Sequence, residues 1–160
     1  MKYAIATLSA CALLSACGTA DGELTAGNWK NTMTMTKFEI PGAPAAMAMQ
    51  AQSVLNKPQS TEACMTPAMA KAGVRDFSSA MQQGDCKMED FKQGGGKMSG
   101  NMVCTGVSGF GAPKMTMNGT YTTEKVSMNL SGEVSDSKIP GGKANIGMTI
   151  TSERIGDCKS

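Results

Sequence analysis

The sequence predicts a mainly β fold of the α+β class: a curved, meander-like antiparallel sheet with one or two short helices, cross-linked by disulfides. Three observations support this. Apolar and polar residues alternate with a period of two over several segments, as they do in strands with one buried and one wetted face. Turns rich in glycine and proline separate these segments. Four cysteines lie beyond a predicted export leader and the cysteine at its cleavage site, an even number that suits two disulfides.

The amino terminus resembles a bacterial lipoprotein signal peptide. Lys2 precedes an apolar run, and Leu14-Ser15-Ala16-Cys17 places small residues before a cysteine, as at a lipoprotein cleavage site. The run is too short to span a bilayer. Cutting before Cys11 instead would leave an apolar core at the lower edge of the usual ~7 to 15 residues. We therefore expect a signal peptide over residues 1–16.

Cleavage there would leave Cys17 as the first residue, followed by a lipidated tether over residues 17–26 and a single β-rich domain over residues 27–160. The resemblance implies that Cys17 carries a diacylglyceryl group and that the new amino terminus is acylated. Two or more acyl chains anchor a protein stably in a membrane, because each buried CH₂ contributes about 0.8 kcal/mol to the binding free energy. Gly18 stands where inner-membrane lipoproteins often carry Asp, so we expect the periplasmic face of the outer membrane. The alternative is an ordinary secretory signal that leaves Cys17 free.

Composition excludes several function classes. Loss of Lys2 with the signal lowers the formal net charge from +2 to +1, and only 4% of residues are aromatic. Neither a basic face nor a stacking platform for nucleic acid is therefore expected. The chain contains no histidine, which removes the commonest general base and a common metal ligand. We expect no cofactor and no catalytic residue, although a hydrolase assembled across the fold remains an alternative.

The cysteine positions favour one of three possible pairings. Cys86 and Cys104 are equidistant from Gly95, so a hairpin turning at this glycine would place them opposite each other. The same register sets Met88 opposite Met102 and keeps apolar residues on one face. Cys64 would then bond Cys158 and close a long loop, worth on the order of 4 kcal/mol. A four-cysteine zinc site is the alternative, but the sequence lacks C-x-x-C spacing.

The first predicted strand begins at Trp29, where apolar residues alternate with lysine and threonine, and ends before Pro41-Gly42. The alanine-rich residues 45–55 predict either a short helix or a flap. Thr66-Pro67 is typical of a helix start, and Gly84 of a helix end. The helix between them is either continuous or broken near Gly73.

Three carboxyl-terminal strands follow, each with a wholly polar opposite face. Turns at Thr123-Glu124 and over residues 135–143 pair Tyr121 with Val126 and Val134 with Ala144. The residues predicted to share the apolar face are Met115, Met117, Gly119 and Tyr121, then Val126, Met128, Leu130, Gly132 and Val134, then Ala144, Ile146, Met148 and Ile150.

Fifteen methionines are the chemically unusual feature. The simplest interpretation is a methionine-rich core. Because methionine is flexible and repacks around varied guests, the apolar face also predicts a site for an apolar ligand, lined by Met117, Tyr121, Met128, Leu130 and Met148. A third interpretation is Cu(I) binding, because thioethers are soft ligands and residues two apart on a strand point the same way. Its candidates are the Met-x-Met pairs at Met33 and Met35, Met47 and Met49, and Met115 and Met117.

Several of these motifs together resemble a family of bacterial periplasmic proteins and lipoproteins known as domain of unknown function 3617. The resemblance covers nearly all of residues 25–158, and its most specific parts are the R-x-G-x-C ending and the order of the cysteines. It implies a small secreted domain with no agreed activity, so no catalytic residue is transferred. The residues that carry it are Gly27-Asn28-Trp29, Cys64-Met65-Thr66-Pro67, Cys86, Cys104, Gly119-Thr120-Tyr121 and Arg154-Ile155-Gly156-Asp157-Cys158.

Overall fold

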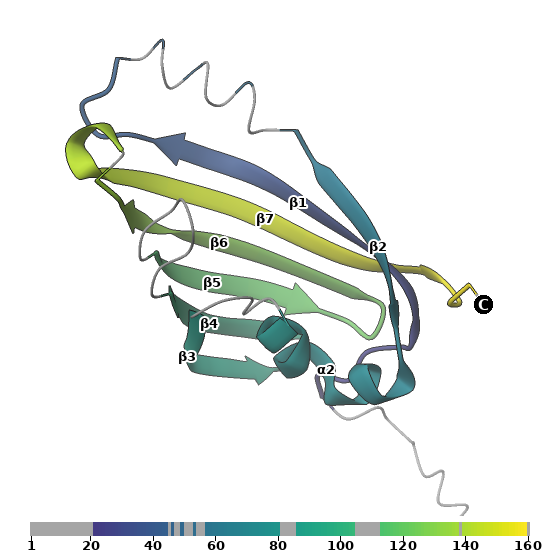
Figure 1. Ribbon diagram of the computed structural model, residues 1–160. Coiled ribbons are helices and arrows are strands. Elements are labelled where there is room, and N and C mark those ends of the chain that lie inside the picture. The colour runs from purple at the N-terminus through teal and green to yellow at the C-terminus, as the bar shows by residue number, and fades with distance from the viewer. Residues whose placement is uncertain are drawn as a thin grey trace, which may run out of the picture.

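The computed structural model describes residues 21–44, 46, 49, 53, 57–80, 86–104, 113–137 and 139–159. In this part of the chain, seven antiparallel strands form one curved sheet, and a helix lies at one end of it (Figure 1). The mainly β class predicted from the alternating segments is confirmed. No helix within the described ranges has the length and apolar character needed to cross a membrane.

The sheet is an open meander to which the first strands are added. β3 to β7 follow one another as neighbours, and β1 pairs with β7, so the sheet order is β2-β1-β7-β6-β5-β4-β3. The elements are β1 (Gly27–Glu39), β2 (Gln59–Met65), α2 (Pro67–Ala80), β3 (Cys86–Gly94), β4 (Lys97–Cys104), β5 (Lys114–Tyr121), β6 (Lys125–Ser135), a 3₁₀ turn (Pro140–Gly142) and β7 (Lys143–Gly156).

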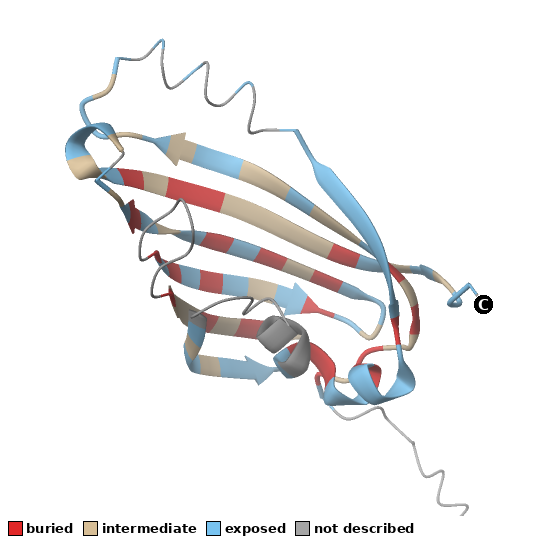
Figure 2. Cartoon of the chain, viewed as in Figure 1, coloured by how far each residue is buried: buried red, intermediate tan, exposed pale blue. Residues whose placement is uncertain are grey.

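β2 is a strand that the sequence did not predict. It lies at the edge of the sheet, and every one of its residues except Met65 is exposed. Figure 2 shows this exposure along most of the strand, in contrast to the buried residues of β5 and β6. A strand with no continuous buried face shows no apolar alternation, so periodicity could not identify it.

The predicted registers of the carboxyl-terminal strands are confirmed. Tyr121 pairs with Val126, and Val134 pairs with Ala144. The inner face of these strands is the core, in which Val126, Met128 and Val134 are fully buried. The simple interpretation of the methionines as core residues therefore holds for this part of the sheet.

The β3–β4 hairpin reaches its predicted register by two compensating features. Cys86 lies opposite Cys104, as expected, but the tip is a two-residue turn at Gly95 and Gly96, where φ is +56° and +74°. That turn alone would shift the cysteines by one residue. A β-bulge centred near Asp90, whose φ is +52°, restores the register.

The helix begins and breaks where the sequence predicts. The Met69 backbone N–H donates to Thr66 Oγ1 at 3.3 Å, which caps the first turn. At Gly73 φ is +72°, and an added Cβ would meet the Gly22 carbonyl oxygen at 2.1 Å, so only glycine fits this break. The predicted end at Gly84 lies outside the described residues, as does most of the predicted helix or flap over residues 45–55.

Part of the predicted tether packs onto the domain. Leu24 is 7% exposed and belongs to the core. Its backbone N–H donates to the Ala70 carbonyl at 2.9 Å, and the Val74 N–H donates to the Gly22 carbonyl at 2.9 Å. Residues 21–26 thus hold α2 against the sheet. Residues 1–20, with the predicted signal peptide and Cys17, lie outside the described residues.

Candidate functional site

An apolar groove of about 720 Å³ crosses the inner face of the sheet. Its lining comes from β2, the first turn of α2, β1, β7, β6 and β4. No Asp, Glu, Lys or Arg is among its described lining residues. Those residues are Trp29, Asn31, Thr32, Met33, Gln59, Thr61, Ala63, Cys64, Met65, Met69, Met102, Leu130, Met148 and Ile150.

The strand register explains why these apolar side chains gather. Met33 pairs with Ile150 where β1 meets β7. Met148 pairs with Leu130 where β7 meets β6, so one apolar surface continues over three strands. Paired side chains on one face lie about 4.5 to 5.5 Å apart at Cβ. The β1–β7 pair therefore joins residues far apart in the sequence into the floor of one groove.

Two methionines remain half exposed in this groove. Met33 on β1 is 44% exposed, and Met69 on α2 is 48% exposed. Both line the groove. Large apolar side chains that share one concave surface and stay open to solvent are typical of a binding surface. The flexible thioether side chains can adapt to the shape of a guest.

The predicted ligand-facing residues divide between groove and core. Leu130 and Met148 line the groove. Met117 and Met128 are 1% and 0% exposed and fill the core beside the groove. Alternation placed all of them correctly on one face, but it does not distinguish the part of a face that is covered from the part that is open.

Tyr121, the remaining predicted ligand-facing residue, has a structural partner. Its hydroxyl donates to Asp21 Oδ1 at 2.6 Å, and its ring is buried. Burial raises the pKa of Tyr121, and the hydrogen bond and negative charge of Asp21 raise that pKa further. This side chain therefore fastens the amino-terminal segment to the domain.

The strand order separates the predicted Cu(I) ligands. Met33 and Met35 lie on β1, whereas Met115 and Met117 lie on β5, with β7 and β6 between them. Three steps of about 4.8 Å separate the two strands, roughly 14 Å in all, so the two pairs cannot share one ion. Met47 lies outside the described residues. Among the described residues, no three His, Cys, Asp or Glu side chains gather as a metal site.

Several lining residues were not predicted, and Ala63, Cys64, Met65 and Met69 illustrate why. Ala63, Cys64 and Met65 reach the groove because β2 pairs with β1, which places Ala63 opposite Trp29, and Met69 follows them on α2. Cys64-Met65-Thr66-Pro67 is one of the motifs of the family resemblance, but nothing in a single sequence indicates that it borders a groove. Trp29 was predicted to begin a strand and to belong to a family motif, but not to line a groove.

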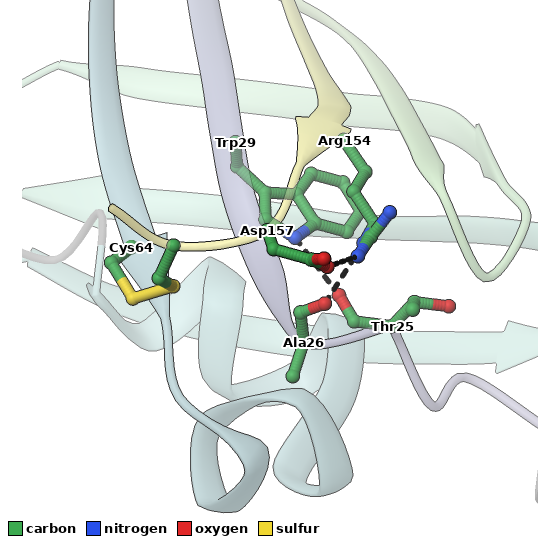
Figure 3. Close-up of polar contacts among 7 residues, drawn as sticks. Thr25, Ala26, Trp29, Cys64, Arg154 and Asp157 are labelled. Carbon is green, nitrogen blue, oxygen red and sulfur yellow. Dashed lines mark hydrogen bonds and ion pairs between the residues drawn. A yellow bond between two sulfur atoms is a disulfide. The ribbon is translucent and has the colours of Figure 1, made fainter. Parts of the chain in front are cut away.

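Three of the motifs, those that contain Trp29, Cys64 and Arg154, meet at one corner of the sheet, beside the groove (Figure 3). The Trp29 indole N–H donates to the Thr25 carbonyl at 2.9 Å, and Arg154 Nε donates to the Ala26 carbonyl at 2.8 Å. Arg154 also forms an ion pair with Asp157. These contacts fix the start of β1 against the end of β7, so this corner has a structural role.

A disulfide completes the corner. Cys64 is bonded to Cys158, with their Cα atoms 5.4 Å apart, which confirms this predicted pair. The bond links the end of β2 to the segment after β7 and so crosses the start of β1. Cys104 also forms a disulfide. Cys86 is its partner in the strand register, but the side chain of Cys86 lies outside the described residues.

No curated protein and no solved structure shows significant similarity to this chain. A family model, described as a protein of unknown function (DUF3617), matches residues 24–158. The match spans the whole sheet, the helix and both ends of the Cys64–Cys158 disulfide. The chain therefore belongs to the DUF3617 family.

Proposed function

We propose that this protein is a non-enzymatic binding module, anchored by lipid at Cys17 to the periplasmic face of the outer membrane, that holds an apolar molecule in the groove. The observation that carries the proposal is the uncharged groove with half-exposed Met33 and Met69 in its lining. Its volume of about 720 Å³ lies within the ~300 to 1,000 Å³ typical of ligand sites.

An open apolar groove is unusual beside a packed protein interior. Side chains pack densely and leave few voids, as those of Met117 and Met128 do here. Beside this packed region, the same face keeps a groove lined by apolar side chains in contact with water. Placing an apolar guest there would remove that surface from water, which is favourable by roughly 25 cal/mol per Å².

The polar groups of the groove support binding without catalysis. They come from Asn31, Thr32, Gln59 and Thr61, whose amides and hydroxyls are uncharged. The nearby Ser152 is fully buried, and its hydroxyl donates to Asn31 Oδ1 at 2.6 Å. A hydrolytic nucleophile needs an adjacent base, and the described lining supplies none.

A fluorescence titration tests the proposal. Trp29 is the chain's only tryptophan and lines the groove, where it is 1% exposed, so a guest that packs against it should change its emission. Mature protein carrying Cys17→Ser would be titrated with a long-chain fatty acid. We expect a saturable change in Trp29 emission and a retained fatty acid in native mass spectrometry.

Matched methionine variants locate the binding. Met33→Gln and Met69→Gln make the groove polar at half-exposed positions and should weaken binding at least tenfold. Met49→Gln is the control, because Met49 is 72% exposed and is not a lining residue. No saturable binding, or equal weakening by all three substitutions, would refute the proposal.

A further inference from the structure

We infer that the end of the groove at Met69 rests on the membrane and that the groove takes an acyl chain of a lipid from that same bilayer. This inference rests on the proposed function, including the lipid at Cys17, and adds the class of ligand and its source. It follows from where the amino-terminal segment is fixed to the fold.

Asp21 fixes that segment to one end of the sheet. Its Oδ1 accepts the Tyr121 hydroxyl at 2.6 Å, and its Oδ2 accepts the backbone N–H of Gly95 at 3.1 Å. The Gln93 side-chain amide also donates to the Asp21 carbonyl oxygen at 3.3 Å. Asp21 is therefore held at the β3–β4 turn and the end of β5.

The short connection to Cys17 keeps this end close to the lipid. Four residue steps separate Cys17 from Asp21, and they reach at most about 14 Å even when fully extended. β7 has 14 residues and spans roughly 46 Å at about 3.3 Å per residue. The tether is thus much shorter than the sheet, and the end that holds Asp21 must stay near the bilayer.

The groove reaches this same end. Residues after Asp21 run along α2. The Leu24 backbone N–H donates a hydrogen bond to the Ala70 carbonyl, and the Val74 N–H donates one to the Gly22 carbonyl. Met69 precedes Ala70 on this helix, is 48% exposed and lines the groove. Figure 1 shows α2, the β3–β4 turn and the β5–β6 turn at one end of the sheet. An acyl chain can therefore enter past Met69 without crossing the length of the domain.

The lining selects the part of a lipid that can enter. The described lining residues include no charged side chain to bind a phosphate or carboxylate. From Met69 the apolar lining continues to Met148 and Leu130. A single acyl chain can lie along this surface while its polar headgroup stays at the bilayer, where it keeps its contact with water.

Quenching by membrane lipids tests the loading step. The full lipidated mature chain would be placed in vesicles of phosphatidylethanolamine and phosphatidylglycerol with brominated acyl chains. We expect Trp29 emission to fall at least twofold relative to vesicles without bromine. Met69→Gln in the lipidated chain should remove most of this quenching, and Met49→Gln should not.

Energy transfer to a dye on the lipid headgroups tests the orientation separately. Lys97 follows the β3–β4 turn, and Glu39 ends β1 at the opposite end of the sheet. Both are exposed, so Lys97→Cys and Glu39→Cys are matched sites for a donor dye. We expect at least threefold more efficient transfer from position 97 than from position 39.

The outcomes separate this inference from the proposed function. If the Cys17→Ser protein binds fatty acid but the lipidated chain shows no quenching of Trp29 by brominated lipid, the groove binds an apolar ligand and loading from the bilayer is wrong. Equal energy transfer from positions 97 and 39 would also overturn the inference. If the Cys17→Ser protein binds no fatty acid, the proposed function itself fails.

Discussion

Two regions of the inner face have similar composition and different packing. Around β5 and β6, Met117 and Met128 are 1% and 0% exposed. Around β1, on the same face of the same sheet, Met33 is 44% exposed and lines the groove. We call these the filled region and the open region. Because both contain methionine, residue type alone does not decide whether a part of the face becomes core or groove.

What differs is the packing above the face. Leu24 of the amino-terminal segment and Ala70 and Val74 of α2 belong to the same buried cluster as Met128 and Tyr121, whereas Met33 is outside it. The open region lies towards β2, an edge strand that is exposed along most of its length. Packing by segments distant in the sequence therefore closes one region and leaves the other open.

We expect the greatest loss of stability when the disulfide at the edge of the open region is removed. Cys64 and Cys158 are 94 residues apart, and the chain-entropy model assigns about 4 to 5 kcal/mol to a loop of that size. Cys64→Ala with Cys158→Ala should lower the free energy of unfolding by about this amount in urea titrations.

Hydrogen exchange shows where that loss occurs. In the double variant, amides of β2 should lose more protection than amides of β5, because the bond joins the end of β2 to the segment after β7. Equal loss of protection in the two strands would mean that the filled and open regions unfold as one unit.

Truncation of one methionine in each region gives the next largest effect. Met128→Ala leaves a cavity in a fully buried site and should cost about 2 to 5 kcal/mol of unfolding free energy. Met33→Ala removes a side chain that is already 44% exposed and should cost about 1 kcal/mol or less. Urea denaturation of both variants measures the difference, and similar losses would contradict the division into two regions.

The filled region was largely predictable from the sequence, because its signals are local. Alternation identified β5, β6 and β7, and short connections set pairs such as Tyr121 with Val126. The R-x-G-x-C ending and the order of the cysteines also indicated the DUF3617 family, whose model matches residues 24–158.

The open region was not predictable, because it depends on contacts between distant segments. β1 pairs with β7, so Met33 lies beside Ile150, and no turn in the sequence specifies that pair. A short polar strand such as β2 has no periodic signal, so the groove that it borders has none either.

A smaller effect is expected at high pH, where the filled region meets the amino-terminal segment. Burial and Asp21 raise the pKa of Tyr121 above 10.0, so the folded state binds this proton more tightly than the unfolded state does. The resulting stability is fully present below pH 10 and is lost as pH rises through the folded-state pKa. Tyr121→Phe should remove this contribution and cost about 1 to 2 kcal/mol at neutral pH through the lost hydrogen bond.

Ultraviolet absorbance checks this titration directly. The chain has two tyrosines, and Tyr3 lies in the predicted signal peptide, so Tyr121 would give the phenolate signal of the mature protein. Asp21→Asn should lower the apparent pKa of Tyr121 because it removes the negative charge. An unchanged pKa in that variant would show that Asp21 does not influence the phenol.

Methionine oxidation compares the two regions most directly. Its rate depends on the exposure of each side chain and involves the smallest change in stability. Peroxide converts a thioether to a polar sulfoxide, and accessible side chains react first. Met33, Met49 and Met69 are 44%, 72% and 48% exposed, so peptide mass spectrometry should find them oxidised well before Met128. Because Met33 and Met69 line the groove and Met49 is not a lining residue, a bound fatty acid should slow oxidation of the first two and leave Met49 unaffected. Equal protection of all three would place the fatty acid elsewhere, and protection of Met33 and Met69 alone would identify the open region as the surface that it covers.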